Sequence, residues 1–254
     1  MEYRCALCSD LSSLGKSSLT VMIPALEMLG VEACPVATGL LSSQSDGFLS
    51  PYTEDASEAY LSILDTWERL GVSFDALYSG WFFSPREMER TARFVKTHPS
   101  LFYLCDPVLG DGGSLYQTMD DERVEAMRGL ASCASLVTPN PTEAALLLDV
   151  PRFEESMVSN LPGRRHLVTG LRTDTGWCVV LDDGKVPFRH RPASFPGTGD
   201  LFDAILLGLL LKGHSLREAV ERTTTLVYLA IERTVRERKY GISVSSIRKE
   251  LVSL

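Results

Sequence analysis

The chain has 254 residues, of which 44% are hydrophobic, and this length and composition suit one large α/β domain with a sizeable core. Its formal net charge of −8 argues against nucleic acid or an anionic membrane as the main partner. The longest apolar run, in the 205–211 region, is too short to span a bilayer. The six cysteines are scattered and the four histidines lie far apart, which indicates neither a redox site nor a metal cluster. The first residues lead into a short apolar strand rather than a signal peptide, so we expect a cytoplasmic protein.

Apolar segments alternate with amphipathic ones along the first half of the chain, which predicts alternating strands and helices. Helices are expected to stop at Gly30 and Gly71, because glycine readily adopts the left-handed conformation that ends a helix. Two polar loops stand out, Asp106–Tyr116 and the Ser-rich Thr38–Pro51, and the length of the second suggests a mobile flap over a site. The expected strands are Tyr3–Cys8, Val31–Ala37, Ala76–Ser79 and Leu101–Cys105, and the expected helices are Ser17–Leu29, Ala56–Leu70, Ser84–His98 and Asp120–Ala131.

The second half continues this alternation, and Asp182–Gly184 predicts a hairpin turn between two strands. Strands that alternate with helices predict a mostly parallel sheet with helices on both faces, in one domain over residues 1–254. Ligands then bind beyond the carboxyl ends of the strands. The expected strands are Leu136–Thr138, His166–Thr169, Trp177–Leu181 and Lys185–Arg191, and the expected helices are Thr142–Leu148, Thr198–Leu211, Leu216–Arg236 and a short one near Val244–Leu251.

The most informative segment is the G-T-G-D motif at Gly197–Asp200, which directly precedes a dense apolar run. The motif places small residues at a helix N-terminus, where free backbone N–H groups and the positive end of the helix dipole attract anions. An aspartate in the first turn is then poised to accept a hydroxyl proton beside a bound phosphate. Taken alone, the motif favours a plain helix start with Asp200 as a cap-type residue, because short glycine motifs recur by chance.

Two further loops follow predicted strands and carry acids. Asp106 and Asp111 lie in a glycine-rich turn and suit Mg²⁺, which prefers oxygen ligands and phosphate bridges; the alternative is a tight loop whose acids bind backbone N–H groups. Asn140 and Glu143, three residues apart, face the same way at a helix start, although a capping box also fits this spacing.

Two weaker signals complete the set. Thr169 and Gly170 end a strand and could contact a phosphate, or simply finish the strand. The segment Asp10–Ser18 contains a Gly-Lys-Ser sequence, but Asp10 stands where a P-loop needs its first glycine, so we reject a P-loop. Asp10 is instead expected to contact a small substrate after the first strand.

Taken in this order, the motifs resemble those of the pyridoxal/pyridoxamine (vitamin B6) kinases of the ribokinase superfamily, over nearly the whole chain. Asp106–Tyr116 is similar to the family's D-P-V-[ML]-G-D-x-G-x-L-Y, and Thr138–Glu143 matches T-P-N-x-x-E. Gly197–Asp200 matches the superfamily's G-T-G-D. Leu40–Phe48 is similar to the flap stretch L-S-N-H-T-G-F, and Tyr78–Phe82 resembles Y-[ST]-G-[YF]-L.

The resemblance implies a ribokinase-like three-layer α/β/α sandwich with a mostly parallel central sheet. It also implies ATP-dependent phosphorylation of the 5′-hydroxymethyl group of pyridoxamine, pyridoxal or pyridoxine, in salvage of pyridoxal 5′-phosphate. Asp200 would be the catalytic base, and the backbone amides of Gly197, Thr198 and Gly199 would hold the anion. The implied ATP contacts are Asp106, Asn140, Glu143, Thr169, Gly170 and Gly199, the implied substrate contacts are Asp10, Ser45, Tyr78, Gly80 and Asp200, and the implied Mg²⁺ ligands are Asp106 and Glu143.

The remaining expectations concern partners and alternatives. The resemblance implies a homodimer that binds ATP and a B6 vitamer, with no nucleic acid and no membrane, and it leaves a need for a monovalent cation such as K⁺ open. Asp10 replaces the serine of many pyridoxal kinases, and its carboxylate could favour a cationic amine or a protonated pyridine. The flap has Ser43–Ser45 in place of Asn-His-Thr. A hydroxymethylpyrimidine kinase, a dual-specificity enzyme and a catalytically silent binding protein of the same fold stay open as alternatives.

Overall fold

The central element of the computed structural model, which describes residues 3–44, 48, 51–191, 195–234 and 240–254, is a six-stranded sheet in the order β3-β2-β1-β4-β5-β8. Every neighbouring pair in this sheet is parallel except β2 with the edge strand β3. The prediction of a mostly parallel central sheet is therefore confirmed. The strands are β1 (Tyr3–Leu14), β2 (Val31–Ser43), β3 (Thr53–Asp55), β4 (Ala76–Ser79), β5 (Phe102–Cys105) and β8 (Leu136–Val137).

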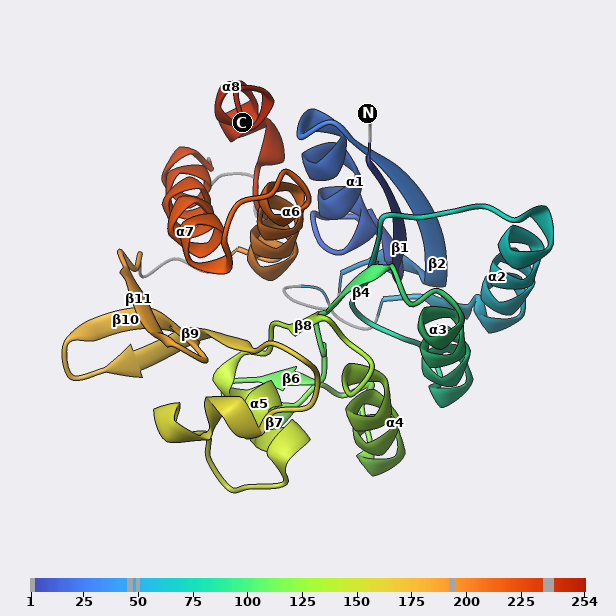
Figure 1. Cartoon of the computed structure of the whole chain (residues 1–254), viewed down its shortest axis with the longest axis horizontal. Helices are drawn as coiled ribbons and strands as arrows, with labels where there is room; N and C mark the ends of the chain where they lie inside the picture. Colours follow the sequence, from blue (N-terminus) through green and yellow to red (C-terminus); the bar gives the residue numbers. More distant parts are fainter. Residues whose placement is uncertain (1–2, 45–47, 49–50, 192–194, 235–239) are drawn as a thin grey trace.

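Helices cover both faces of this sheet (Figure 1). Successive side chains of a strand point to opposite faces, and β1 follows this rule: Leu7 packs in one apolar cluster while Ala6 and Cys8 pack in the other. The first cluster contains α1 (Leu19–Met28), α6 (Thr198–Leu211), α7 (Leu216–Arg233) and α8 (Arg248–Val252), and the second contains α2 (Ser57–Leu70), α3 (Pro85–Thr97), α4 (Asp121–Ala131) and α5 (Pro141–Leu148). None of the helices in the described ranges has the length and hydrophobicity of a membrane-spanning segment.

Smaller elements extend the sandwich. β9 (Leu167–Thr173), β10 (Gly176–Leu181) and β11 (Gly184–Phe188) form an antiparallel sheet, which confirms the predicted hairpin. An isolated parallel bridge between Val137 and His166 connects this region to the central sheet. The remaining elements are the hairpin of β6 (Gly110–Asp111) with β7 (Ser114–Leu115) and the 3₁₀ helices η1 (Glu155–Asn160) and η2 (Val244–Ile247).

The first two strands are much longer than predicted, and this corrects the expected flap. β1 and β2 keep pairing beyond a register shift between Ser9 and Leu11. β3 then pairs back onto residues 39–41 of β2, so residues 38–43 of the expected loop Thr38–Pro51 are strand. Asp10 consequently lies on β1 rather than in a loop after it. Sequence periodicity misses this extension because it depends on a pairing partner, not on local pattern.

Other boundaries also move. α1 begins at Leu19 instead of Ser17, because Ser18 takes a left-handed φ of 48° that a helix cannot include. The loop predicted at Asp106–Tyr116 contains the β6–β7 hairpin, and the terminal segment is a 3₁₀ helix followed by α8. All cysteines are free, and burial raises the pKa of the Cys5 and Cys8 thiols, as expected for unreactive core residues.

Candidate active site

The candidate active site lies where the central strands end and α6 begins. Tyr78, at the end of β4, is fully buried, and its hydroxyl lies between two carboxylates from distant parts of the chain. It donates to Oδ2 of Asp106, just after β5, at 3.2 Å, and to Oδ1 of Asp200, in the first turn of α6, at 3.4 Å. One phenolic proton is thus shared between the two acids. The fold brings together three residues that were predicted separately.

Burial and mutual repulsion dominate the electrostatics of these groups. Desolvation, with the nearby Asp200 charge, raises the pKa of Asp106 to about 8. Desolvation also raises the pKa of Asp200 to about 6. A backbone hydrogen bond from Ser18 lowers this pKa, and the charge of the neighbouring Asp10 carboxylate raises it. Such crowding of acids is typical of sites that meet a cation or move a proton.

The first turn of α6 owes its shape to two glycines with different roles. Gly197 has a left-handed φ of 82°, and a Cβ there would lie 2.2 Å from the Lys16 carbonyl oxygen. A Cβ at Gly199 would meet nothing within 4 Å, so open space lies beside an amide that has no intrahelical acceptor. The Thr198 amide, also expected to hold an anion, already donates to the Phe195 carbonyl oxygen at 3.2 Å.

Asn140 and Glu143 form the capping box that the sequence left open as an alternative. The Asn140 side chain accepts from the Glu143 amide at 3.0 Å and donates to the Gly110 carbonyl oxygen at 2.8 Å. Glu143 accepts from the amides of Asn140 at 2.9 Å and Leu109 at 3.3 Å. The pair therefore ties the start of α5 to the loop that carries Asp106. Burial, with the Asp106 charge, raises the pKa of Glu143.

Asp10, a predicted substrate contact, is buried, with 5% of its surface exposed. Its Oδ2 accepts from the Ser12 hydroxyl at 2.9 Å, and burial raises its pKa. Gly80 allows β1 and β4 to approach, because a Cβ there would lie 2.7 Å from Ser9 Oγ and 3.0 Å from Tyr78 Oη. Ser45, the remaining predicted contact, lies outside the described residues.

The other predicted contacts have local partners. The Thr169 amide donates to the Pro139 carbonyl oxygen at 2.9 Å, which places Thr169 beside the Asn140 turn. Gly170 lies within β9 with a left-handed φ of 66°. Asp111 is exposed and accepts from the Gly112 amide at 2.7 Å, the role given by the loop alternative.

Asp203 is a site residue that the motifs missed. It lies one turn after Asp200 on α6, is 2% exposed, and accepts from the Thr138 hydroxyl at 3.2 Å through Oδ2. Its Oδ1 is buried without a hydrogen-bond partner among the described residues. Burial, then the Asp106 charge, raises its pKa well above the usual range. The available signal was a lone acid inside an otherwise apolar run.

Comparison with known proteins identifies the family. A family model for phosphomethylpyrimidine kinase matches residues 23–245. The chain belongs to this kinase family. It is similar to the pyridoxal kinase PdxY of Burkholderia orbicola (25% identity, covering 89% of this chain and 87% of the relative) and to human pyridoxal kinase (31% identity, covering 61% and 60%).

Solved structures agree on the fold. The crystal structure of Lactobacillus plantarum pyridoxal kinase superposes with a TM-score of 0.91 at 26% identity, covering 99% of this chain and 97% of that one. A Bacteroides thetaiotaomicron protein assigned to the phosphomethylpyrimidine kinases gives 0.91 at 31% identity, covering 98% and 94%. The ribokinase-like fold and the predicted family are therefore confirmed. The protein is a phosphotransferase with an alcohol acceptor, and membership of a kinase family implies ATP as the donor.

The donor set of this kinase fits a magnesium ion shared with a nucleotide. No group of three or more His, Cys, Asp or Glu side chains in the described ranges is arranged to hold a metal alone. Mg²⁺, however, is usually bound by one or two carboxylates together with phosphates and waters. The orphaned Asp203 Oδ1, beside Asp106, is the kind of buried oxygen that such an ion would satisfy.

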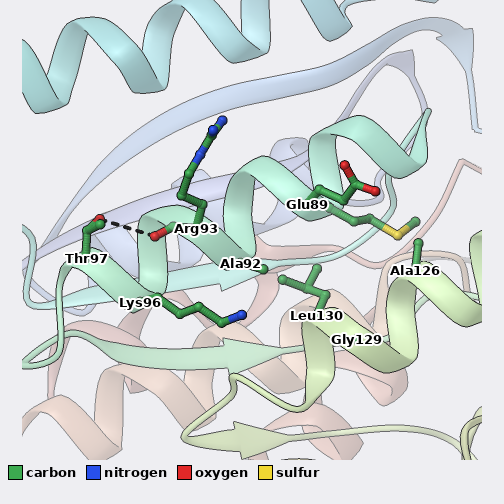
Figure 2. Close-up of a pocket in the computed structure, with 9 residues that line it drawn as sticks. Glu89, Ala92, Arg93, Lys96, Thr97, Ala126, Gly129 and Leu130 are labelled. Carbon is green, nitrogen blue, oxygen red and sulfur yellow. Dashed lines mark hydrogen bonds between the residues drawn. The ribbon is translucent and has the colours of Figure 1, made fainter.

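A groove between α3 and α4 lies apart from this site (Figure 2). Arg93 and Lys96 of α3 lie along it, and Ala126 and Gly129 of α4 form its other wall. None of the predicted site residues lines it. We therefore base the functional assignment on the ends of the strands, not on this groove.

Proposed function

We propose that the protein transfers the γ-phosphate of ATP to the 5′-hydroxymethyl group of a vitamin B6 vitamer. The observation that carries the proposal is Asp200, a carboxylate in the first turn of α6 that shares the Tyr78 proton with Asp106. The Burkholderia and human relatives named above are pyridoxal kinases, and a crystal form of the Bacteroides relative contains pyridoxal. Both facts favour a vitamer as the acceptor.

Asp200 would act as the general base. Its raised pKa of about 6 lies near neutral pH, where a carboxylate is ionised and still able to take a proton. The open space beside Gly199 lets a phosphate approach the helix N-terminus, whose amides stabilise the negative charge of the transferring group. Magnesium, when bound, supplies neutralising charge for the phosphates, and Asp106 and Glu143 would hold it.

On the acceptor side, Asp10 would face the pyridine ring or its amino substituent, with Tyr78 and Gly80 lining the pocket. Ser45, which lies outside the described residues, is the remaining proposed substrate contact. Asn140, Thr169 and Gly170 would contact the nucleotide where the turn before α5 lies beside β9. We further propose that residues 1–254 form one kinase domain, that the enzyme is a cytoplasmic homodimer, and that its product enters the salvage of pyridoxal 5′-phosphate.

A second candidate is phosphorylation of hydroxymethylpyrimidine. It is favoured by the family model, whose name refers to that chemistry. A coupled assay of ADP release over pyridoxal, pyridoxamine, pyridoxine and hydroxymethylpyrimidine separates the two, with each phosphorylated product identified by mass. We expect the highest kcat/KM with a B6 vitamer. A kcat/KM at least tenfold higher for hydroxymethylpyrimidine, or no turnover of any vitamer, would contradict the proposal.

A further inference from the structure

Asp203 has a buried carboxylate oxygen with no assigned role. Its side chain is 2% exposed and packs under the site from α6. Oδ2 is occupied by the Thr138 hydroxyl at 3.2 Å, whereas Oδ1 has no hydrogen-bond partner among the described residues. An unpaired buried carboxylate oxygen is costly, and a bound cation is one way to offset that cost.

The charged groups that act most strongly on the Asp203 carboxylate among the described residues are three other acids, Asp106, Asp200 and Glu143. The Asp106 and Asp203 carboxyl groups lie close enough to share a hydrogen bond, but that bond requires one of them to keep a proton, and in their ionised forms both only accept hydrogen bonds. The nearby hydroxyl protons are already committed, that of Tyr78 to Asp106 and Asp200 and that of Thr138 to Asp203. Within the described ranges, the Lys, Arg and His side chains that form ion pairs do so with other acids.

We propose that Asp106 and Asp203 together hold a magnesium ion before any nucleotide binds. Carboxylate oxygens are its preferred protein ligands, and two are enough when waters complete the shell. The inference rests on the proposed function only in assigning Asp106 to the phosphate side, and it needs no vitamer. In this protein Asp203 thereby adds a ligand to the Asp106 and Glu143 pair expected from the motifs.

The test is magnesium binding by the full-length, nucleotide-free protein. MgCl₂ is titrated at constant ionic strength, and the melting temperature and the heat of binding are recorded. Asp203→Asn keeps the size of the side chain and an oxygen for the Thr138 hydroxyl, and it removes the charge. We expect this variant to bind Mg²⁺ at least about tenfold more weakly and to lose the thermal shift. Asp174→Asn, on an exposed turn, is the matched control and should bind like the wild type.

Three results would overturn the inference. The first is equal Mg²⁺ affinity of Asp203→Asn and wild type. The second is no Mg²⁺ binding by the wild type together with a higher melting temperature of Asp203→Asn in metal-free buffer. That result would mean that a proton shared between Asp106 and Asp203, rather than a cation, offsets their mutual repulsion. The third is saturation by K⁺ with no response to Mg²⁺. Failure of the vitamer assay would leave the magnesium result unchanged, so the two proposals are tested separately.

Discussion

The two glycines of the G-T-G-D motif should respond to the same substitution in opposite ways. Gly197→Ala places a methyl group 2.2 Å from the Lys16 carbonyl oxygen and 2.9 Å from Val21 Cγ2, at a φ of 82°. Gly199→Ala places a methyl group in open space within a helical turn. The first change should therefore destabilise the fold, and the second should leave the stability intact and impair catalysis.

The magnitudes follow from the local geometry. A left-handed residue with a side chain costs about 1–2 kcal/mol, and overpacking against a carbonyl and a core valine adds about 1–3 kcal/mol. Gly197→Ala should thus lower the free energy of unfolding by about 2–5 kcal/mol. Alanine is favoured over glycine in a helix by about 0.5–1 kcal/mol, so Gly199→Ala should unfold at an equal or higher denaturant concentration. Its methyl group would occupy the approach of the phosphate and should raise the KM for ATP.

Urea unfolding monitored by tryptophan fluorescence, together with steady-state kinetics, measures both effects. Gly213→Ala is the matched control, because Gly213 has a φ of 88° but no atom within 4 Å of an added Cβ. It should cost only the backbone contribution of about 1 kcal/mol. Equal losses in Gly197→Ala and Gly213→Ala would refute the close packing against Lys16. An unchanged KM for ATP and kcat in Gly199→Ala would refute the placing of the phosphate at α6.

Three further predictions concern charged groups. Asp200→Ala should abolish transfer while ATP binding stays measurable by calorimetry. The wild-type kcat/KM should fall below a pH of about 6, because the base becomes protonated there. Near-normal turnover of the variant, or a wild-type pH profile that stays flat down to pH 5, would refute the role of Asp200 as the base. Asp10→Ser should lower the ratio of the kcat/KM for pyridoxamine to that for pyridoxal several-fold. An unchanged ratio would refute the hypothesis that Asp10 recognises the charge of the substrate. Glu87, fully buried with Oε1 unpartnered among the described residues, has a pKa raised by burial from 4.5 to about 7. Because the folded state holds the proton more tightly, stability should fall by about 3 kcal/mol as pH rises from 4.5 to 7; Glu87→Gln should flatten this profile, and an equal slope in both proteins would contradict it.

The order of strands and helices was predictable because each element buries one face and shows this in its own periodicity. The G-T-G-D and Asn140–Glu143 segments were predictable for a similar reason, since a helix start has local chemistry. The length of β1 was not, because residues 11–14 are strand only through pairing with β2. Sequence periodicity reports burial within a segment and is silent about a partner that lies far along the chain.

The missed parts of the site have the same origin. Tyr78 was expected to line the substrate pocket, and its donation to both Asp106 and Asp200 requires the ends of β4 and β5 to lie beside the start of α6. Asp203 stands three residues beyond a motif that ends at Asp200. Its burial becomes visible only once α6 is packed on the sheet.

The cluster of acids also lowers the stability of the ligand-free protein. Asp106, Asp200, Asp203 and Glu143 all have pKa values raised chiefly by burial, which means that their ionised forms destabilise the free protein. Natural proteins keep such groups where the free energy of ligand binding offsets the cost of burying the charge. A cation bound between Asp106 and Asp203 would lower the repulsion felt by Asp200. A phosphate at the α6 N-terminus would then be attracted both by this cation and by the positive end of the helix dipole. Metal and nucleotide should therefore raise the melting temperature together by more than the sum of their separate effects.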